Sequence, residues 1–308
     1  MGTAKQVQIG HLTLPSSRLV YGCMRINGDG SSQAVAQGKH AIRTAIDAGY
    51  NHFDHANIYG GGQCESIFGE VMKESPELRD KLIITSKAGI RFAVESKPDS
   101  VKRYDFRKQH LISEVEASLK RLNVDALDLF LLHRPDYLFD PHEVAETFEQ
   151  LKRQGKVKQF GVSNFKPSQL TMLQSFTQEK LVANQVEINI HNVDAFENGT
   201  LDQCFKDNIT AMAWCPIATV VYEAWGNTFS ETDIARIHQE LDRQAQIYNE
   251  EKWIVMLAWL MKHPVNICPI IGSTNPQRIN AAMRALDIGY SREDWYRLLQ
   301  ARNGEPVA

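Results

Sequence analysis

The chain has 308 residues, of which 43% are hydrophobic and 23% charged, and its formal net charge is −3. This even charge balance, with lysines and arginines scattered along the chain, argues against a nucleic-acid surface. No run approaches the ~18 uninterrupted apolar residues of a membrane span, and residues 1–20 lack the layout of a secretory signal. Five cysteines without a Cys-x-x-Cys pair are typical of reduced thiols. We therefore expect a globular cytoplasmic protein that binds neither nucleic acid nor membrane.

Short runs rich in β-forming residues alternate with amphipathic segments along the chain. The alternation predicts strands over residues 19–24, 52–54, 82–87, 126–133, 157–164, 182–188, 211–217 and 266–272. Helices are expected over residues 33–48, 65–73, 110–122, 141–154, 167–176, 200–206, 231–248, 251–262 and 276–286. Since no linker or change of composition interrupts this series, residues 1–308 are expected to form one domain.

Eight strand–helix units predict an α/β fold that closes into a (β/α)₈ TIM barrel, because near-continuous apolar strands fit a parallel sheet covered by helices. An open doubly wound sheet is the alternative, and the lack of Gly-x-Gly-x-x-Gly after the first strand counts against it. Residues 7–14 are expected to form an N-terminal β-hairpin, turning at Gly10 and His11, that caps the lower end of the barrel. Residues 291–302 predict an extra C-terminal helix.

Polar residues that could carry chemistry follow three consecutive predicted strands. Asp54 ends the second strand with Tyr59 just beyond it, Lys87 ends the third, and His133 ends the fourth. In (β/α)₈ enzymes the catalytic residues lie at the carboxyl ends of strands. An ammonium group stabilises phenolate, a carboxylate orients the ammonium, and an imidazole can donate a hydrogen bond to a developing oxyanion. These residues therefore predict proton transfer to a carbonyl oxygen, although a lysine–aspartate pair or a strand-end histidine can also be purely structural.

The stretch from residue 52 to 62 allows two further interpretations. His52, Asp54 and His55 could form part of a metal site, but later strand ends offer no partner histidine except His133. No metal is therefore expected, and the two-residue period of a strand turns His55 away from the face of Asp54, so we expect it to be packed. Residues 60–62 are glycines that give the chain a tight exit from the strand, and they are a weak signal for a phosphate loop.

Six stretches resemble the motifs of the aldo-keto reductase superfamily, in the family's order and over nearly the whole chain. They are FDHANIYGGGQCE (53–65), TSKAG (85–89), LLHRPD (131–136), GVSNF (161–165), NQVE (184–187) and PIIGSTNPQRI (269–279). The resemblance is closest to bacterial members with Asp-His-Ala-x-x-Tyr-Gly-Gly. It implies reduction of an aldehyde or ketone with NADP(H), or alternatively NAD(H), and the family's catalytic tetrad corresponds to Asp54, Tyr59, Lys87 and His133.

The resemblance also implies where the nucleotide binds, since the chain has no Rossmann loop. In barrels of this kind the loops after strands seven and eight offer a phosphate site. Arg278 would face the 2′-phosphate, and Trp214 would stack on the nicotinamide. The nicotinamide carboxamide would be held by Ser163, Asn164 and Gln185. The full set implied for nucleotide binding is Gly22, Met24, Asp54, Ser163, Asn164, Gln185, Trp214, Ile271, Gly272, Ser273, Thr274 and Arg278.

Three departures from the family pattern concern the nucleotide. Gly272 stands where many NADP-preferring members have lysine, and Ala281 and Ala282 stand where glutamate and asparagine commonly meet the adenine. The stretch CPIATVVYEAWGN (215–227) lacks the family's Ser-Pro-Leu-Gly-x-Gly pattern. Gly272 thus weakens the case for the phosphorylated cofactor, and the nucleotide is expected to be bound either weakly or in a different arrangement.

The substrate is expected to be a small carbonyl compound, and its specificity to lie in the long loops 89–109 and 218–230. Tyr222 and Trp225 in the second loop would provide an aromatic pocket. Two other functions compete with reduction. One is a nucleotide-binding partner protein that senses redox state, as in potassium-channel β-subunits, which resemble this family; the other is a metal-dependent barrel hydrolase. The sequence does not determine the oligomeric state.

Overall fold

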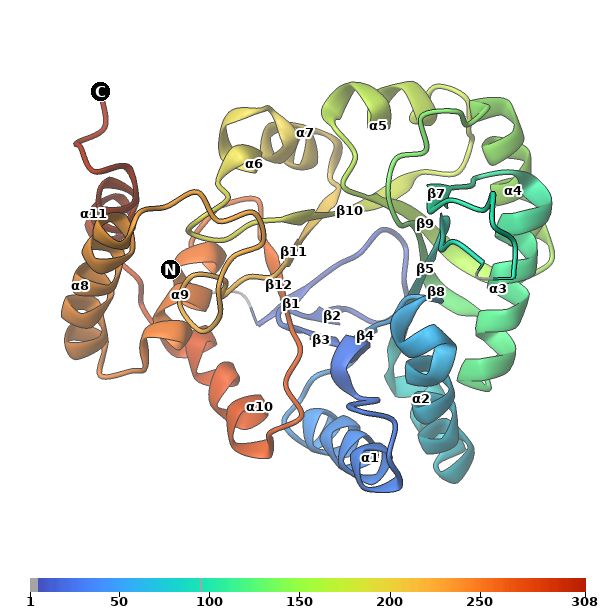
Figure 1. The fold of residues 1–308 in the computed structure, drawn as a ribbon, viewed down its shortest axis with the longest axis horizontal. Helices are drawn as coiled ribbons and strands as arrows, with labels where there is room; N and C mark the ends of the chain where they lie inside the picture. Colours follow the sequence, from blue (N-terminus) through green and yellow to red (C-terminus); the bar gives the residue numbers. More distant parts are fainter. Residues whose placement is uncertain (1–4, 95) are drawn as a thin grey trace.

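The computed structural model describes residues 5–94 and 96–308, and its centre is a closed barrel of eight parallel strands (Figure 1). Each strand is followed by helices that surround the barrel, so the predicted (β/α)₈ fold is confirmed. Most barrel strands are buried along their whole length, as expected when a parallel sheet is covered on both faces. In chain order the strands are β3 (Val20–Gly22), β4 (His52–Asp54), β5 (Ile83–Ala88), β8 (Leu127–Leu132), β9 (Val157–Ser163), β10 (Leu181–Glu187), β11 (Thr210–Trp214) and β12 (Cys268–Ile271).

The helices lie close to their predicted positions. The predicted helix 276–286 divides in two, with an α-helix that ends at Ala282 and a 3₁₀ turn, η4 (Met283–Asp287). Caps fix several starts: the side chains of Ser31 and Asp140 accept hydrogen bonds from backbone N–H groups of the first turn. The α-helices are α1 (Ser32–Asp47), α2 (Gln63–Glu74), α3 (Lys108–Leu122), α4 (Pro141–Arg153), α5 (Pro167–Gln174), α6 (Asp194–Glu197), α7 (Thr200–Asp207), α8 (Glu231–Tyr248), α9 (Lys252–Met261), α10 (Pro276–Ala282) and α11 (Arg292–Asn303).

The N-terminal hairpin closes the lower end of the barrel, as predicted. Its two strands, β1 (Gln6–Val7) and β2 (Ser16–Ser17), are antiparallel, and Val7 is the single residue of these strands that lies within the predicted range 7–14. The pairing ends early because Ile9 and Leu12 leave the hairpin and pack into the barrel interior, in one cluster with Ile83, Leu129 and Val182. The connecting segment therefore serves as a hydrophobic plug.

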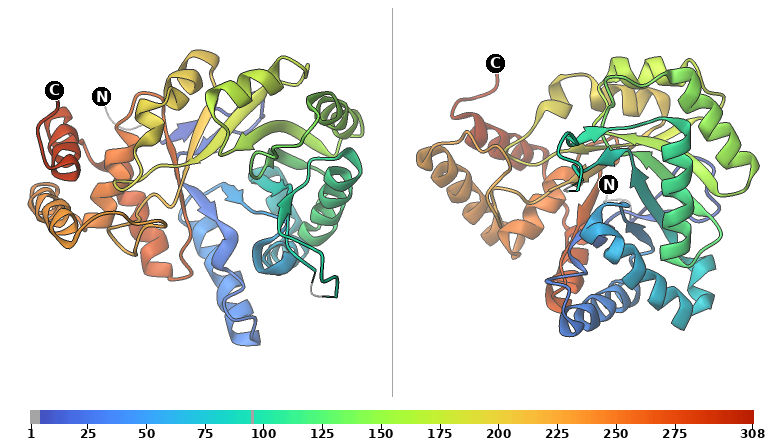
Figure 2. Two further views of the ribbon diagram at one scale, coloured as in Figure 1. Left: turned by 45° about the horizontal axis from the view of Figure 1, so that its top comes forward. Right: turned by 45° about the vertical axis from the view of Figure 1, so that its right-hand side comes forward.

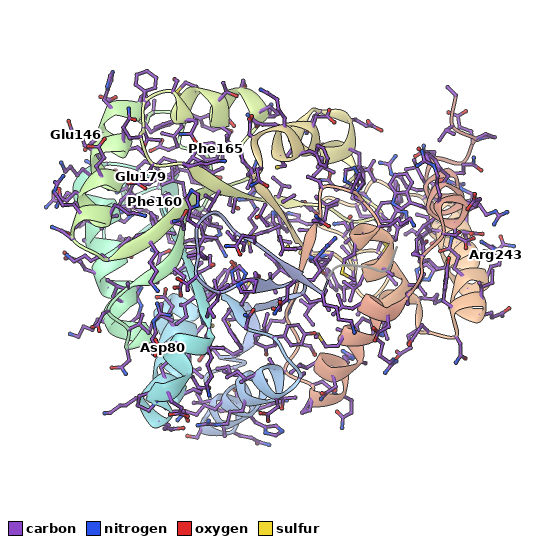
Figure 3. All side chains as sticks on the ribbon, turned by 180° about the vertical axis from the view of Figure 1, so that it is seen from behind. Asp80, Glu146, Phe160, Phe165, Glu179 and Arg243 are labelled. Carbon is purple, nitrogen blue, oxygen red and sulfur yellow. The ribbon has the colours of Figure 1, made fainter. Side chains whose placement is uncertain are left out.

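Aliphatic and aromatic residues form the hydrophobic core, and Figure 3 labels two of the aromatic ones, Phe160 and Phe165. Phe160 of β9 stacks on Phe148 of α4, with ring centres 4.3 Å apart. Just after β9, Phe165 stacks on Phe106 at 6.4 Å. These contacts fix the end of β9, where Ser163 and Asn164, the two polar residues before Phe165, belong to the candidate site.

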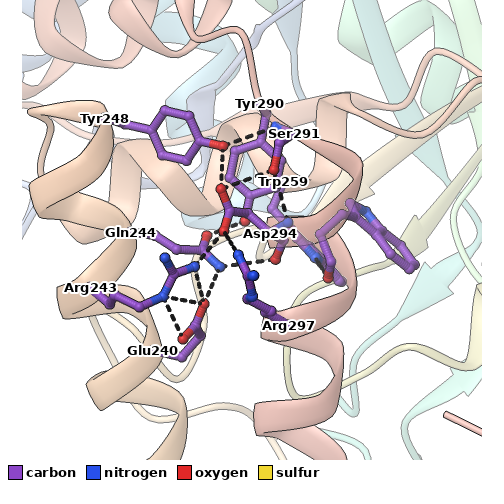
Figure 4. Close-up of polar contacts among 10 residues, drawn as sticks. Glu240, Arg243, Gln244, Tyr248, Trp259, Tyr290, Ser291, Asp294 and Arg297 are labelled. Carbon is purple, nitrogen blue, oxygen red and sulfur yellow. Dashed lines mark hydrogen bonds and ion pairs between the residues drawn. The ribbon is translucent and has the colours of Figure 1, made fainter. Parts of the chain in front are cut away.

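Two helices lie outside the ring that covers the barrel: α8 and α11 run side by side at one edge of the molecule (Figures 1 and 2). Asp294 of α11 joins them, because its carboxylate accepts hydrogen bonds from Tyr248 at 2.8 Å, from Arg297 at 3.1 Å and from Arg243 (Figure 4). The Gln244 side chain donates to the backbone oxygen of Asp294 at 2.9 Å. The predicted C-terminal helix is thus present and bound to α8.

The long loop after β5 contains a short antiparallel ladder, β6 (Ile90–Arg91) with β7 (Arg103–Tyr104). Asp105 stabilises its base, since its carboxylate pairs with Arg91 at 3.1 Å and with Arg107 at 2.6 Å. In the part of the chain that the structure describes, no helix is both long enough and apolar enough to span a membrane.

Candidate active site

Asp54 and Lys87 form a buried ion pair at the carboxyl ends of β4 and β5. Asp54 is paired in register with Thr85, and Lys87, two residues further along β5, points to the same face of the sheet. The Lys87 Nζ lies 2.7 Å from one carboxylate oxygen of Asp54 and 2.6 Å from the other, and the side chains are 0% and 3% exposed. Burial alone would lower the pKa of Lys87, but the charge of Asp54 and the Tyr59 hydroxyl outweigh it and raise that pKa. The ammonium therefore stays charged.

Tyr59 lies beside this pair at the start of the 3₁₀ turn η2 (Tyr59–Gly62). The Lys87 Nζ is 5.2 Å from the centre of the Tyr59 ring. Burial raises the pKa of the Tyr59 hydroxyl, and the charge and hydrogen-bonding contact of Lys87 act in the opposite direction. The net pKa is raised, although the neighbouring lysine alone would lower it. The phenol is consequently protonated at neutral pH and has a cation next to it that would stabilise the phenolate.

The three glycines after Tyr59 are required by the backbone. Gly60, Gly61 and Gly62 all have positive φ, of 56°, 62° and 93°, a region that side chains make costly. This turn lets the chain leave the strand end and enter α2 immediately. The structure thus provides a conformational reason for the glycines that needs no phosphate.

His133 follows the end of β8, and its ring centre is 6.1 Å from that of Tyr59. Burial, together with the charges of Lys87 and Arg134, lowers the pKa of His133 well below its ordinary value, so the imidazole is neutral at pH 7. Its Nδ1 is buried and has no hydrogen-bond partner in the described chain. A neutral imidazole keeps one N–H donor, which is what a ligand oxygen in the site would require.

The other two histidines of this region are structural. His52 bridges the hairpin and the barrel, with its ring nitrogens 2.8 Å from Ser16 Oγ and 2.7 Å from Thr85 Oγ1. His55 is buried against Phe68, with ring centres 4.6 Å apart, which confirms that it is packed. Within residues 5–94 and 96–308, no group of three histidine, cysteine, aspartate or glutamate side chains is placed to hold a metal ion.

A chain of hydrogen bonds that the sequence did not reveal joins Trp214 to Asp54. Trp214 Nε1 donates to Asn164 Oδ1 at 3.0 Å, and the Asn164 amide donates to Ser163 Oγ at 2.8 Å. Ser163 Oγ then donates to the backbone oxygen of Gln185 at 2.9 Å, and Gln185 Nε2 donates to Asp54 at 2.9 Å. Asn164 holds a left-handed backbone conformation, with φ of 62°. Four of the residues implied for nucleotide binding are therefore mechanically coupled to the ion pair.

The other residues implied for nucleotide binding lie at or just after the ends of β3 and β12. Gly22 and Gly272 approach each other so closely that a Cβ at Gly272 would lie 3.0 Å from the Gly22 carbonyl oxygen. This contact explains why position 272 carries glycine here. The Arg278 side chain is exposed and makes no hydrogen bond or ion pair within the described residues, while its backbone N–H donates to Asn275 at 3.0 Å. Further residues of this group are Met24, which is 48% exposed, Ile271, Ser273 and Thr274.

The loop after β11 departs from the expected glycine pattern and has an unusual backbone. Cys215 and Thr219 have positive φ, of 50° and 70°, without being glycine. Tyr222 is half-buried, and the Arg25 guanidinium lies 5.8 Å from its ring centre. Trp225 is 77% exposed. The role of both aromatic residues in substrate binding stays a prediction.

Sequence reasoning also missed Arg134, although it stands in the quoted stretch LLHRPD directly after His133. Its Cζ lies 5.3 Å from the centre of the Trp214 ring. The guanidinium therefore reaches from the end of β8 to the end of β11, across the mouth of the barrel.

A closed (β/α)₈ barrel with a buried Lys–Asp pair, a phenol and a neutral imidazole at its carboxyl rim defines a protein equipped to move a proton to or from a bound ligand. The model of the Aldo/keto reductase family matches residues 18–303. The chain therefore belongs to the aldo-keto reductase family.

Proteins similar over nearly the full length include oxidoreductases. The chain is 40% identical to the "Uncharacterized oxidoreductase YcsN" of Bacillus subtilis, covering 96% of this chain and 97% of that protein. It is 37% identical to the "6-dehydroglucose reductase" of Agrobacterium fabrum, covering 96% and 97%. Among solved structures, the thermostable aldo-keto reductase Tm1743 with the inhibitor epalrestat has a TM-score of 0.82 at 28% identity, covering 96% and 99%.

Proposed function

We propose that this protein reduces an aldehyde or ketone to an alcohol, with NADP(H) as the hydride donor and Tyr59 as the general acid. The observation that carries the proposal is the contact of a charged, buried Lys87 with both the Asp54 carboxylate and the Tyr59 phenol. A carbonyl oxygen that receives hydride at its carbon becomes an alkoxide and needs a proton at once. Tyr59 is protonated at neutral pH, and Lys87 stabilises the phenolate that remains.

The residues around the mouth fit a nicotinamide nucleotide. Trp214 is half-buried and offers an indole face, and Gln185 Oε1 accepts no hydrogen bond from the described residues. Ser163 and Asn164 are already bonded to protein partners, so they would bind a carboxamide by exchanging a contact. Arg278 supplies an exposed cation suited to a phosphate. When bound, the nucleotide supplies the hydride.

The protein's own groups then divide the work. His133 donates a hydrogen bond to the carbonyl oxygen and orients it, because its uncharged ring retains one N–H. Tyr59 transfers its proton to the same oxygen, and Asp54 keeps Lys87 charged and in place. Asp54, Lys87 and His133 are buried and Tyr59 is half-buried, which limits the access of water and strengthens these electrostatic contacts.

The names of relatives indicate a first substrate to assay. Relatives at 36% and 37% identity, from Novosphingobium aromaticivorans and Agrobacterium fabrum, are called 6-dehydroglucose reductase. Their substrate is a sugar-derived aldehyde. We include 6-dehydroglucose in the assay, beside simple aromatic aldehydes.

The test is transfer of deuterium from NADPH labelled at C4 to an aldehyde, with mass spectrometry of the alcohol. Label in the alcohol at catalytic turnover supports the proposal. Tight nucleotide binding with no turnover across a broad panel would contradict it and favour a redox-sensing partner protein. Activity that requires a metal and stops with a chelator would favour a barrel hydrolase.

A further inference from the structure

Arg134 is a half-buried cation at the barrel mouth that has no anionic partner among the described residues. It follows His133 directly, and its guanidinium covers the Trp214 ring at 5.3 Å. Within residues 5–94 and 96–308 it forms neither an ion pair nor a hydrogen bond, whereas the rim arginines Arg91 and Arg107 both bind Asp105. Partly buried charges are normally paired. The partner of Arg134 is therefore expected to come from outside the chain.

The charges around Arg134 leave it uncompensated. The charge of Lys87 is balanced by Asp54 at 2.6 Å, and both Tyr59 and His133 are uncharged at neutral pH. The carboxylate of Glu187, at the end of β10, accepts a hydrogen bond from Asn189 at 3.1 Å. The carboxylate of Asp136 accepts hydrogen bonds from the backbone N–H groups of Phe106 and Leu138. Neither carboxylate forms an ion pair with Arg134 among the described residues.

We propose that Arg134 is a specificity-determining residue that binds a carboxylate of the carbonyl substrate, so that the protein prefers anionic aldehydes and ketones to neutral ones. This inference rests on the proposed reductase function and names a substrate class for it. A guanidinium binds a carboxylate through two parallel hydrogen bonds, and a partly desolvated mouth strengthens the pair. A neutral sugar aldehyde, the class in the names of the relatives, would leave Arg134 unpaired.

The geometry also sets where the carboxylate would lie. Arg134 follows His133 directly in the chain, and its guanidinium lies 5.3 Å from the centre of the ring that is expected to stack on the nicotinamide. A substrate held by both His133 and Arg134 must therefore carry its carboxylate within a few bonds of the carbonyl carbon. A long acyl chain that ends in a carboxylate would not satisfy both contacts.

The experiment compares isosteric substrate pairs. The ortho, meta and para carboxybenzaldehydes and their carboxamides are reduced with NADPH by the parent, Arg134→Met, Arg134→Lys and Arg107→Met. Methionine keeps an unbranched chain over Trp214 but removes the charge. Arg107→Met removes a rim cation that already has Asp105 as its partner, so it controls for the general loss of positive charge.

For the parent, kcat/KM should favour at least one carboxylate over its carboxamide by about tenfold, or about 1.4 kcal/mol, mainly through KM. In Arg134→Met that ratio should fall to about one, Arg134→Lys should keep part of it, and Arg107→Met should keep it within about twofold. The inference is overturned if the parent shows no preference for any isomer, or if Arg134→Met retains it. It is equally overturned if Arg134→Met weakens NADPH binding about tenfold with the preference unchanged, because Arg134 would then serve a nucleotide phosphate.

A failure of the reductase proposal gives a different result. If no carbonyl compound is reduced, calorimetric titration of the parent and Arg134→Met with benzoate and with benzamide still tests the site. Benzoate binding that is lost in Arg134→Met, with benzamide bound weakly by both proteins, supports an anion site at Arg134. Equal binding of benzoate by both proteins refutes it.

Discussion

The two halves of the barrel mouth differ in how completely they are assembled. At the ends of β4, β5 and β8, Lys87 is 0% exposed and held by both oxygens of Asp54, with Tyr59 and His133 beside it. At the ends of β11 and β12, Arg278 is exposed and the connecting loop is irregular. The half proposed to transfer the proton is pre-organised, whereas the half proposed to bind the nucleotide phosphates leaves the Arg278 side chain open to a ligand. Pre-organised charges favour catalysis and adaptable loops favour ligand entry.

The largest effect is expected when the pre-organised half loses its proposed proton donor, Tyr59. Tyr59→Phe should reduce single-turnover reduction of an aldehyde by at least ~10²-fold, because general acid catalysis typically contributes ~10²–10⁴-fold. The phenyl ring keeps the packing, so the dissociation constant of NADPH should stay within about twofold of the parent. Rapid-mixing absorbance and nucleotide titration measure the two quantities. Reduction within about tenfold of the parent would show that another group donates the proton.

Removing one partner of the ion pair should cost folding stability as well as activity. Lys87→Met leaves the Asp54 carboxylate buried without its cation, so the free energy of unfolding should fall by about 3–5 kcal/mol. Adding Asp54→Asn should restore much of it, since a neutral amide is cheaper to bury. Urea denaturation of both variants measures the difference. A loss below ~1 kcal/mol would mean that water reaches the carboxylate, contrary to the sealed arrangement.

Acid should lower the folding stability of the protein, because buried histidines of the pre-organised half are uncharged in the folded state. Burial lowers the pKa of His55 from 6.5 to about 3, so below pH 6.5 the unfolded chain takes up a proton that the folded chain rejects. Stability is present above that pH and is lost as pH falls toward 3, by at most ~1.4 kcal/mol per pH unit for one group. In His55→Leu the free energy of unfolding should fall by about 2 kcal/mol less than in the parent when the pH is lowered from 6.5 to 5. Substituting the exposed His11 by asparagine is the control, and equal slopes in parent and His55→Leu would contradict the assignment.

The smallest effect concerns the open half. Arg278→Ala should raise the dissociation constant of NADPH about tenfold, as expected for loss of one charged hydrogen-bonding partner. The dissociation constant of NADH should stay within about twofold of the parent value. Since the Arg278 side chain makes no hydrogen bond or ion pair with the described residues, folding stability should not change. Fluorescence titration with both nucleotides measures the ratio. If both nucleotides weaken equally, Arg278 contacts the diphosphate or acts indirectly.

The predictions from sequence were most accurate where local periodicity determines structure. Helices such as α8 and the eight strands follow from hydrophobic spacing, and the order of units implied closure. The hairpin was predicted a few residues out of place because Ile9 and Leu12 leave its ladder to plug the barrel. No local pattern distinguishes a paired hairpin residue from one that turns inward.

Prediction of the candidate active site from sequence has the same limit. Asp54, Lys87 and His133 could be chosen from sequence because parallel strands bring their carboxyl ends to one rim. The sequence alone determined the barrel and the chemical groups at its mouth, through the spacing of apolar residues and the residue types at strand ends.

Only the tertiary structure decided how those groups act. The pKa of Tyr59 is raised because burial outweighs the neighbouring lysine, and burial is a property of the packed molecule. The hydrogen bonds from Trp214 to Asn164 and the reach of Arg134 over that indole join residues 50 and 80 positions apart. Electrostatic and hydrogen-bonding energies depend on distance and solvent exposure, and the folded chain sets both.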